Sequence, residues 1–346
     1  MQPKLRKLAI AAGAVLLVPA VTAFRYSGFN DTAARQTANR ATTWLKTQQL
    51  ADGSFEVAGF PGFETPDAIL AIAENAQQQA TWSRQQARAA VNATKRGNNS
   101  AMHAIDDVAD TGPNAGQAAK LVVLVAKPLS LNPKKFDPDG DGAANLRAII
   151  DAGKQPNGSY GAFNATLYAA IAKRILGKVP PETLAFIRNS QEAGGGWNYA
   201  GDRTGNFADI DTTGLAVQAL VAARVPKTDV DLRQGLAFLA RAHQSSGAWQ
   251  SFGSDDPNST SVATLAVTAA GFDPTVRCWR DAVAPALANH GYTSPTAWLR
   301  SRQQANGRIL SPSDSFGINT FPTTQTIEAL RRGWIPVKPL GKQQCG

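Results

Sequence analysis

A short phrase recurs along the chain: a glutamine, a few small or polar residues, a glycine, one further residue, and then an aromatic or apolar residue. The closing residues of these phrases lie 105, 37, 52 and 60 positions apart. Because the first interval is about twice the others, we expect a sixth, degenerate unit in it, for which 112–126 fits. A repeat of this period is the mark of stacked supersecondary units. The five clear phrases are Gln49–Phe55, Gln155–Tyr160, Gln191–Trp197, Gln244–Trp249 and Gln304–Ile309.

Each phrase stands between two helical patterns of different character. The segments before it carry charge, as in 35–46, 232–243 and 295–303, and we expect them to lie outside. The segments after it are apolar nearly all round and rich in Ala and Thr, which predicts helices buried on every side. These inner segments are 67–73, 164–172, 211–220, 261–270 and 323–330. Since the last one is as apolar as the others, the sequence favours a closed ring over an open solenoid, whose ends need polar caps.

The Gln-x-x-x-Gly-x-Trp phrase followed by an Asp- or Thr-led apolar helix resembles the repeat of the squalene–hopene cyclase and protein prenyltransferase superfamily. The resemblance covers about residues 30–337. It implies an all-α fold, the α6/α6 toroid, built from about six helix pairs and also found in cobalamin carriers. The chain looks like a small, secreted, bacterial member with one toroid. Fold alone does not settle activity, because enzymes and binding proteins share this ring.

The first residues read as a secretory signal. Lys4, Arg6 and Lys7 precede an apolar run that is too short to span a bilayer, and small residues follow it. We therefore expect a signal peptide over 1–23, a single toroid domain over 24–340, and a short polar tail over 341–346. The predicted location is secreted or extracytoplasmic, with no membrane span in the mature chain.

The charge argues against one class of partner, and the cysteine content argues against one class of fold. The net charge is +9 over 346 residues, and no basic run with interleaved aromatics occurs, which argues against nucleic acid. The two cysteines, Cys278 and Cys345, are too few for a disulfide scaffold. Their pairing and the oligomeric state stay open.

Asp209 and Asp211 are the candidate catalytic residues. The segment 208–213 resembles the Asp-x-Asp-Asp-Thr motif of proton-initiated cyclases, which implies Asp211 as the acid and Asp209 as its acidic neighbour. The third acidic position is Thr212 here, which weakens the match. Neighbouring carboxylates in an apolar cavity raise one pKa. The alternative is that Asp211 only caps its helix. The family's full-length cyclases also add a second helical domain, for which this chain has no room.

The loops after the phrases carry aromatic side chains that could hold an apolar ligand. Gln and Trp of the phrases themselves are expected to be scaffold. The predicted ligand-binding residues are Phe60, Phe63, Tyr199, Phe207, Phe252 and Thr213.

Two kinds of metal site can be compared with the sequence. Asp137, Asp139 and Asp141 alternate as in a calcium loop, but the bidentate Glu expected at the twelfth position is Ala148, so the alternative is a solvated loop. The zinc site of the prenyltransferases is disfavoured, because Val276 replaces its Asp two residues before Cys278 and no histidines cluster. Calcium is therefore the one candidate cofactor.

Three functions follow, from different classes. The sequence favours a toroid that binds a small apolar or ring-shaped ligand (an isoprenoid, a lipid or a cobalamin-like molecule) without turnover. The first alternative is a minimal proton-initiated terpene cyclase with Asp211 as general acid. The second is an interaction protein of the cell envelope, whose partner or second domain the sequence does not identify.

Overall fold

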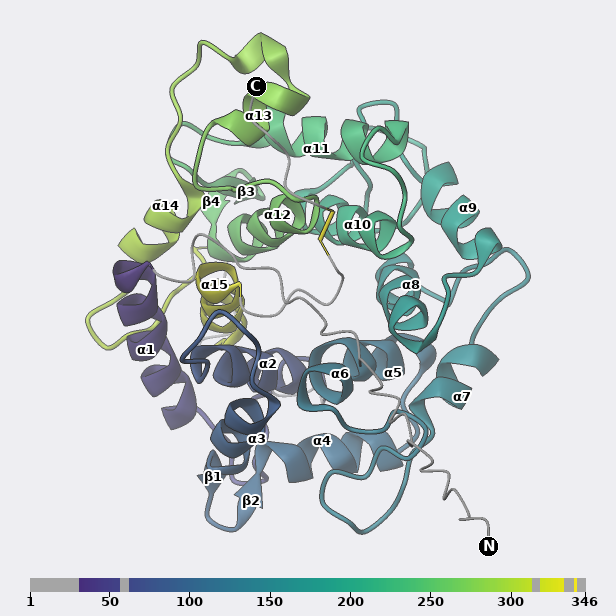
Figure 1. Cartoon of the computed structure of the whole chain (residues 1–346), viewed down its shortest axis with the longest axis vertical. Helices are drawn as coiled ribbons and strands as arrows, with labels where there is room; N and C mark the ends of the chain where they lie inside the picture. The colour runs from purple at the N-terminus through teal and green to yellow at the C-terminus, as the bar shows by residue number, and fades with distance from the viewer. Residues whose placement is uncertain (1–30, 57–61, 313–317, 333–338, 341–346) are drawn as a thin grey trace, which may run out of the picture.

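The fold is a closed ring of helices inside a second ring. The computed structural model describes residues 31–56, 62–312, 318–332 and 339–340, and Figure 1 views it down the axis of the rings. The predicted signal peptide and tail lie outside the described residues. The inner helices are α2 (Thr65–Asn75), α5 (Ala115–Leu121), α8 (Phe163–Leu176), α10 (Ile210–Ala222), α12 (Pro257–Ala269) and α15 (Phe321–Arg331). The predicted all-α toroid is confirmed.

The outer ring is made of shorter and more polar helices. Their apolar residues face the inner ring on one side only, as in α11, where Leu232, Leu236 and Leu239 are buried. In chain order the outer helices are α1 (Thr32–Thr47), α3 (Arg84–Asn92), α4 (Ala101–Asp110), α7 (Leu146–Ala152), α9 (Pro181–Asn189), α11 (Val230–Ala242), α13 (Cys278–Val283) and α14 (Pro295–Ser301), with a 3₁₀ turn, η3 (Pro285–Leu287), between the last two.

The degenerate sixth unit is an inner helix. It starts at α5, where Asn114 and Gln117 form a reciprocal capping box. It continues through a π-helical segment, η2 (Val122–Ala126), into α6 (Lys127–Leu129). This element packs between α2 and α8. The phrase before it has lost its aromatic residue, but the apolar run 118–126 still predicted the helix.

The ring is closed by contacts between its first and last units. α15 packs against both α1 and α2, as Figure 1 shows on the left. Arg300 on α14 forms an ion pair with Asp31 at 3.1 Å between Nη1 and Oδ2. The Gln303 amide donates to the Thr37 carbonyl at 2.8 Å, and Arg331 donates to the Gln77 carbonyl at 2.7 Å. Polar capping repeats are therefore unnecessary.

Two glutamines of the phrase, Gln49 and Gln191, join one unit to the next. Gln191 donates to the carbonyl of Gly195 in its own turn and to that of Asp231 on the following outer helix, both at 2.8 Å. Gln49 makes the same pair of bonds to Gly53 and Thr94. In the last unit Gln303 has this role, one position before the glutamine that the phrase predicted. The scaffold prediction is confirmed for Gln49 and Gln191, whereas Gln155 and Gln244 donate only to the carbonyls two residues before them and Gln304 is exposed.

Threonines of the inner helices hold the closing residue of each phrase. The backbone N–H of Trp197 donates to the Thr213 hydroxyl at 2.9 Å. Trp197 and Trp249 have no exposed surface, and each indole N–H donates to an outer-helix carbonyl. The same backbone-to-threonine bond occurs at Phe55–Thr65, Tyr160–Thr166, Trp249–Thr260 and Ile309–Thr323.

Two small antiparallel hairpins interrupt the helices. β1 (Lys95–Arg96) pairs with β2 (Asn99–Ser100), and β3 (Trp249–Ser251) pairs with β4 (Ser254–Asp256). The second hairpin joins the fourth phrase to α12 and carries Phe252 and Gly253 at its tip, both with positive φ. It therefore projects an aromatic ring from the end of the inner ring where α12 begins.

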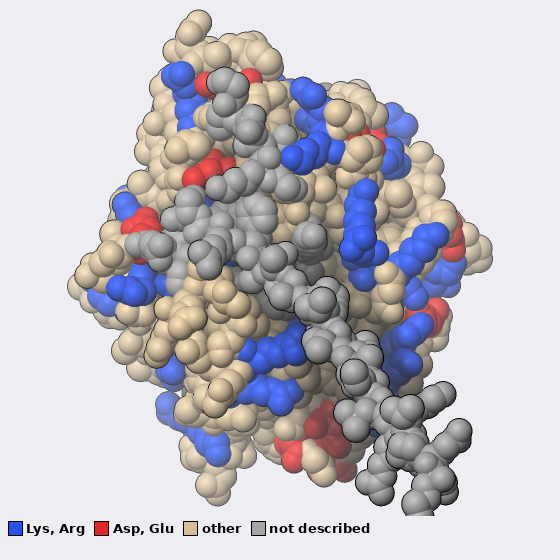
Figure 2. All heavy atoms as spheres, viewed as in Figure 1, with Lys and Arg blue, Asp and Glu red and all other residues tan. Residues whose placement is uncertain are grey.

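On the face that Figure 2 shows, Lys and Arg lie in separate groups. Among the described residues no helix is long and apolar enough to cross a membrane. Cys278 is disulfide-bonded, and Cys345 lies outside the described residues.

Candidate functional site

The inner ring encloses a cavity of about 730 Å³. Inner helices line it with residues three or four positions apart, starting from the first turn, because that spacing keeps side chains on one face of a helix. α10 contributes Asp211, Leu215 and Gln218. The corresponding stripes on other helices are Asn258, Val262 and Leu265 on α12, Phe321, Gln325 and Glu328 on α15, and Asn164, Tyr168 and Ile171 on α8.

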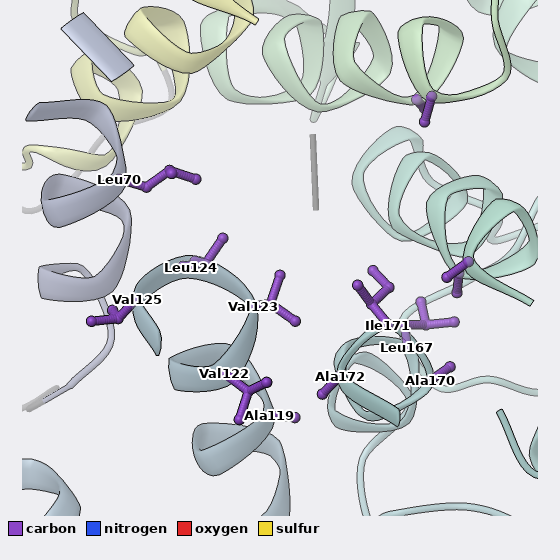
Figure 3. Close-up of a cluster of buried hydrophobic side chains, with 14 of the residues drawn as sticks. Leu70, Ala119, Val122, Val123, Leu124, Val125, Leu167, Ala170, Ile171 and Ala172 are labelled. Carbon is purple, nitrogen blue, oxygen red and sulfur yellow. The ribbon is translucent and has the colours of Figure 1, made fainter. Parts of the chain in front are cut away.

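The middle of the cavity is mostly apolar. In Figure 3 Leu70, Val123, Leu124 and Ile171 point from α2, η2 and α8 into the space between the inner helices. All four residues are buried, and at most 6% of their surface is exposed. A concave, mainly apolar cavity of this volume suits a small organic ligand.

Three of the predicted aromatic residues stand at the mouth of the cavity. Phe63, Tyr199 and Phe252 all line it, and their exposed fractions are 50%, 68% and 96%. Phe63 also packs against Phe321, with ring centroids 5.4 Å apart. The structure thus brings together aromatic rings from three separate loops.

The other predicted ligand-binding residues have different places. Phe207 is 76% exposed and is not among the residues that line the cavity. Thr213 has no exposed surface and does not line the cavity either, because its hydroxyl is bonded to the backbone of Trp197. Phe60 lies outside the described residues.

Asp209, and not Asp211, is the N-cap of α10. Its carboxylate accepts a hydrogen bond from the Thr212 backbone N–H at 2.7 Å. Asp211 lies in the first turn, where its side chain lines the cavity. Asp209 therefore caps the helix and also borders the cavity, whereas Asp211 borders the cavity without capping the helix.

The environment of Asp211 favours the protonated form of its carboxyl. The Asp211 side chain is exposed, and it borders the cavity. Desolvation raises the pKa of Asp211 to about 7, with smaller contributions in the same direction from the charges of Asp209 and Asp256, while a hydrogen bond with Ser259 acts against them. A large fraction of Asp211 is therefore protonated at neutral pH.

A second polar cluster lies on the wall formed by α2, α5 and α15. Lys120 Nζ is 2.6 Å from Asp67 Oδ2, and it also donates to the Phe63 carbonyl at 2.6 Å. The ammonium lies 4.6 Å from the ring centroid of Phe63 and 5.6 Å from that of Phe321. A cation between aromatic faces is stabilised by their quadrupoles.

Glu328 belongs to the same cluster and is the second candidate acid. It lines the cavity with 5% of its surface exposed, and its Oε1 has no hydrogen-bond partner among the described residues. Desolvation, followed by the charges of Asp67 and Glu74, raises the pKa of Glu328 well above its ordinary value. Burial therefore favours the neutral form of the Glu328 carboxyl.

Further cavity-lining oxygens also lack a hydrogen-bond partner in the described part of the chain: Gln325 Oε1, Asn258 Oδ1 and Asn164 Oδ1. Buried polar atoms are normally satisfied by protein or water. These acceptors are consistent with a cavity that holds water or a ligand with donor groups.

Lys120, Gln325 and Glu328 were missed by the sequence analysis. The signal was present, because a charged residue inside an otherwise apolar inner helix is costly unless it is paired or faces a cavity. Lys120 stands in Ala-Ala-Lys-Leu-Val-Val, and Glu328 in Thr-Ile-Glu-Ala-Leu. A search for charged residues within the apolar inner segments would have identified both Lys120 and Glu328.

The three aspartates of the acidic loop come together outside the cavity. Asp137, Asp139 and Asp141 each place a carboxylate oxygen within 4.8 Å of the others, and Asp106 on α4 joins them. Among the described residues this is the only group of His, Cys, Asp and Glu side chains close enough to share a metal ion.

Comparison with known proteins gives a structural likeness only. No protein-family model and no curated protein matches the chain. The structure of the type II terpene cyclase MstE from Scytonema, in its apo form, has a TM-score of 0.59 at 15% identity and covers 87% of this chain and 97% of that chain. A complex of an MstE variant with merosterolic acid A, described as product, has a TM-score of 0.58 at 15% identity, with coverages of 90% and 99%.

A third structure, of an MstE variant with geranylgeranyl dihydroxybenzoate, described as substrate, has a TM-score of 0.56 at 15% identity and covers 90% of this chain and 99% of that one. These similarities show a terpene cyclase-like toroid. The alignments span nearly the whole of those chains, so the single toroid corresponds to nearly all of each of them.

Proposed function

We propose that this toroid binds a linear isoprenoid in its central cavity and cyclises it, with Asp211 as the acid that starts the reaction. The observation that carries the proposal is the position of Asp211. Its carboxyl faces the cavity, is not used as the helix cap, and has a pKa raised to about 7. The position of Asp211 thus favours catalysis, whereas the sequence alone favoured binding without turnover.

The chemistry needs few groups. The Asp211 carboxyl donates its proton to one carbon of a terminal double bond, which leaves a tertiary carbocation on the other. An internal double bond supplies its electron pair to that cation, and a ring bond forms. The last cation loses a proton to a base or to water, so the product is an isomer of the substrate. Solvent then returns a proton to Asp211.

The cavity wall suits such cations. Leu215, Val262 and Leu265 supply an unreactive surface beside Asp211, and exclusion of water by such a surface suppresses side reactions. The rings of Tyr168 and Phe321 also line the cavity, but the Lys120 ammonium already lies 5.9 Å and 5.6 Å from their centroids. The apolar side chains beside Asp211 are therefore the part of the wall that suits a carbocation.

Binding without turnover is the second candidate function. The observation that favours it is the open mouth, where Tyr199 and Phe252 are mostly exposed. Water that reaches a carbocation through this mouth would quench it, so the cyclase requires the aromatic loops to pack over the bound substrate.

The test is product analysis with two matched variants. The purified protein is incubated with linear isoprenoids of different length, squalene and geranylgeraniol included, and the extract is examined by gas chromatography–mass spectrometry. We expect a new isomer with the wild type and with Glu328→Gln, and none with Asp211→Asn. If only Glu328→Gln fails to form the isomer, Glu328 and not Asp211 is the acid. Retention of an unaltered isoprenoid by all three proteins would support binding without turnover.

A further inference from the structure

The acidic loop between α6 and α7 is closed and held in place by a buried anchor. Phe136 and Ala144 exchange two backbone hydrogen bonds of 2.9 Å, and Phe136 has no exposed surface. Within the loop, the N–H of Gly140 donates to Asp137 Oδ1 at 2.8 Å. The loop therefore presents Asp137, Asp139 and Asp141 from a fixed base.

The fourth carboxylate comes from a different element. Asp106 lies on α4, 33 residues before Asp139, and only 1% of its surface is exposed. Its Oδ2 accepts a long bond of 3.4 Å from the Asp139 backbone N–H. Its Oδ1 is buried and has no hydrogen-bond partner among the described residues. A buried carboxylate oxygen left without a donor is costly unless a cation or water satisfies it.

The cluster has one basic partner, His103, whose Nδ1 lies 2.5 Å from Asp139 Oδ2 and whose pKa is raised by that hydrogen bond. No Lys or Arg of the described residues forms a salt bridge with any of the four aspartates, so one imidazole stands against four carboxylates. Asp107 and Asp110 on α4 add further negative charge nearby. Figure 2 shows red side chains over α4 and this loop. Four carboxylate oxygens at this separation repel one another in the absence of a cation.

We propose that Asp106, Asp137, Asp139 and Asp141 bind one Ca²⁺ ion. Their hard carboxylate oxygens are the ligands that Ca²⁺ prefers, and backbone carbonyls and water complete the six to eight oxygens that it takes. The sequence lacks the Glu that closes an ordinary calcium loop at position 148. Asp106 replaces it from another helix, and this is why the loop pattern looked incomplete.

The site would join two parts of the ring. Asp106 is on α4, which packs against α2, while the loop leads into α7, which packs against α5. Both α2 and α5 line the central cavity. Bound Ca²⁺ therefore stabilises the wall that carries Asp67 and Lys120 without touching it. The site is separate from the proposed acid, so its failure would leave the cyclase proposal standing.

The test is thermal unfolding of the purified chain in EGTA and in CaCl₂, with calorimetric titration of Ca²⁺. We expect a dissociation constant of about 0.1–1 mM, as for extracellular calcium modules. The unfolding temperature should rise by several degrees at about ten times that concentration, because an ion that binds only the folded state stabilises it by mass action. MgCl₂ at equal concentration should give a smaller rise.

Variants separate binding from folding. Asp139→Asn should weaken Ca²⁺ binding at least tenfold, and Asp106→Asn should remove the calcium response while raising the unfolding temperature in EGTA, because it relieves the repulsion. Asp202→Asn, the same change in an exposed loop elsewhere, should leave the response intact. The proposal is overturned by no rise in CaCl₂, by an equal rise in MgCl₂ or in NaCl of matched ionic strength, or by a full response in Asp139→Asn.

Discussion

Asp209 caps α10 with a hydrogen bond of 2.7 Å from the Thr212 backbone N–H, and this leaves the carboxyl of Asp211, two residues along, free to face the cavity. Two adjacent carboxylates thus have separate tasks in one helical turn. Asp209 begins the helix and also borders the cavity, and its charge adds to the desolvation that raises the pKa of Asp211.

Turnover should fall as pH rises through about 7, because only the protonated Asp211 can donate. Its pKa is raised to about 7, so the active fraction drops about tenfold for each pH unit above that. Initial rates between pH 5 and 9 measure this limb. Glu328→Gln should keep it. A limb that disappears in Glu328→Gln, or a rate that rises above pH 7, would contradict the assignment.

The same ionisation should affect stability. The pKa of Asp211 is higher in the folded chain than its ordinary 3.8, so the folded state binds the proton more firmly. Its contribution to folding is fully present below about pH 3.8 and is lost as pH rises through about 7. Asp211→Asn removes this dependence. Its free energy of unfolding, measured with urea, should therefore exceed that of the wild type at pH 8 by more than at pH 5; an equal difference at both would refute this.

Asp209 offers a pair of variants that separate its cap from its charge. Asn caps helices about as well as Asp, so Asp209→Asn should keep the fold and move the pH limb of turnover to lower pH. Asp209→Ala removes the cap and should cost about 1 kcal/mol in the free energy of unfolding. Urea unfolding and rate profiles on both variants check this. An unchanged limb in Asp209→Asn would mean that its charge does not act on Asp211.

Lys120→Met should destabilise the fold strongly. It leaves Asp67 buried without its partner, and such losses cost about 3–5 kcal/mol. Replacing both members, in Lys120→Met with Asp67→Leu, should recover most of that loss, because no unpaired charge remains. Urea unfolding of the single and double variants measures the difference. A double variant less stable than Lys120→Met would show that the pair is not the source of the cost.

Thr213→Val should lower the free energy of unfolding by about 1–3 kcal/mol, because the buried N–H of Trp197 loses its acceptor while the shape is kept. Thr43→Val is the matched control, since Thr43 is exposed and only donates to a carbonyl within α1. Thermal unfolding compares the two. Equal effects would mean that the repeated threonine bond adds no more than a surface hydroxyl.

The ring could be predicted from the sequence because its rule is local and repeated. The sequence of each unit indicates its own turn and its own buried helix. The run 118–126 was recognisable as an inner helix even though its phrase lacks an aromatic residue. The site was less predictable. Asp211 was found by its motif, but the choice between cap and acid depended on the backbone at Asp209. Two positions separate the cap, Asp209, from the proposed acid, Asp211, and one position separates Gln303, which makes the bonds, from Gln304, which the phrase predicted.

Residues that act through contacts between distant units were not predictable from spacing. Asp106 joins the acidic loop across 33 positions of sequence, and Lys120 meets Asp67 from a different inner helix. A pattern read along the chain shows which residues share a helix face. It does not show which faces of separate helices meet, and closure of the ring decides that.

The most direct test of the central claim is deuterium incorporation. The protein is incubated with a linear isoprenoid in D₂O, and the products are examined by mass spectrometry. Proton-initiated cyclisation predicts a cyclic isomer that carries one deuterium from solvent, formed by the wild type and absent with Asp211→Asn. A cyclic product without deuterium, or one that Asp211→Asn still forms at the wild-type rate, would contradict the account.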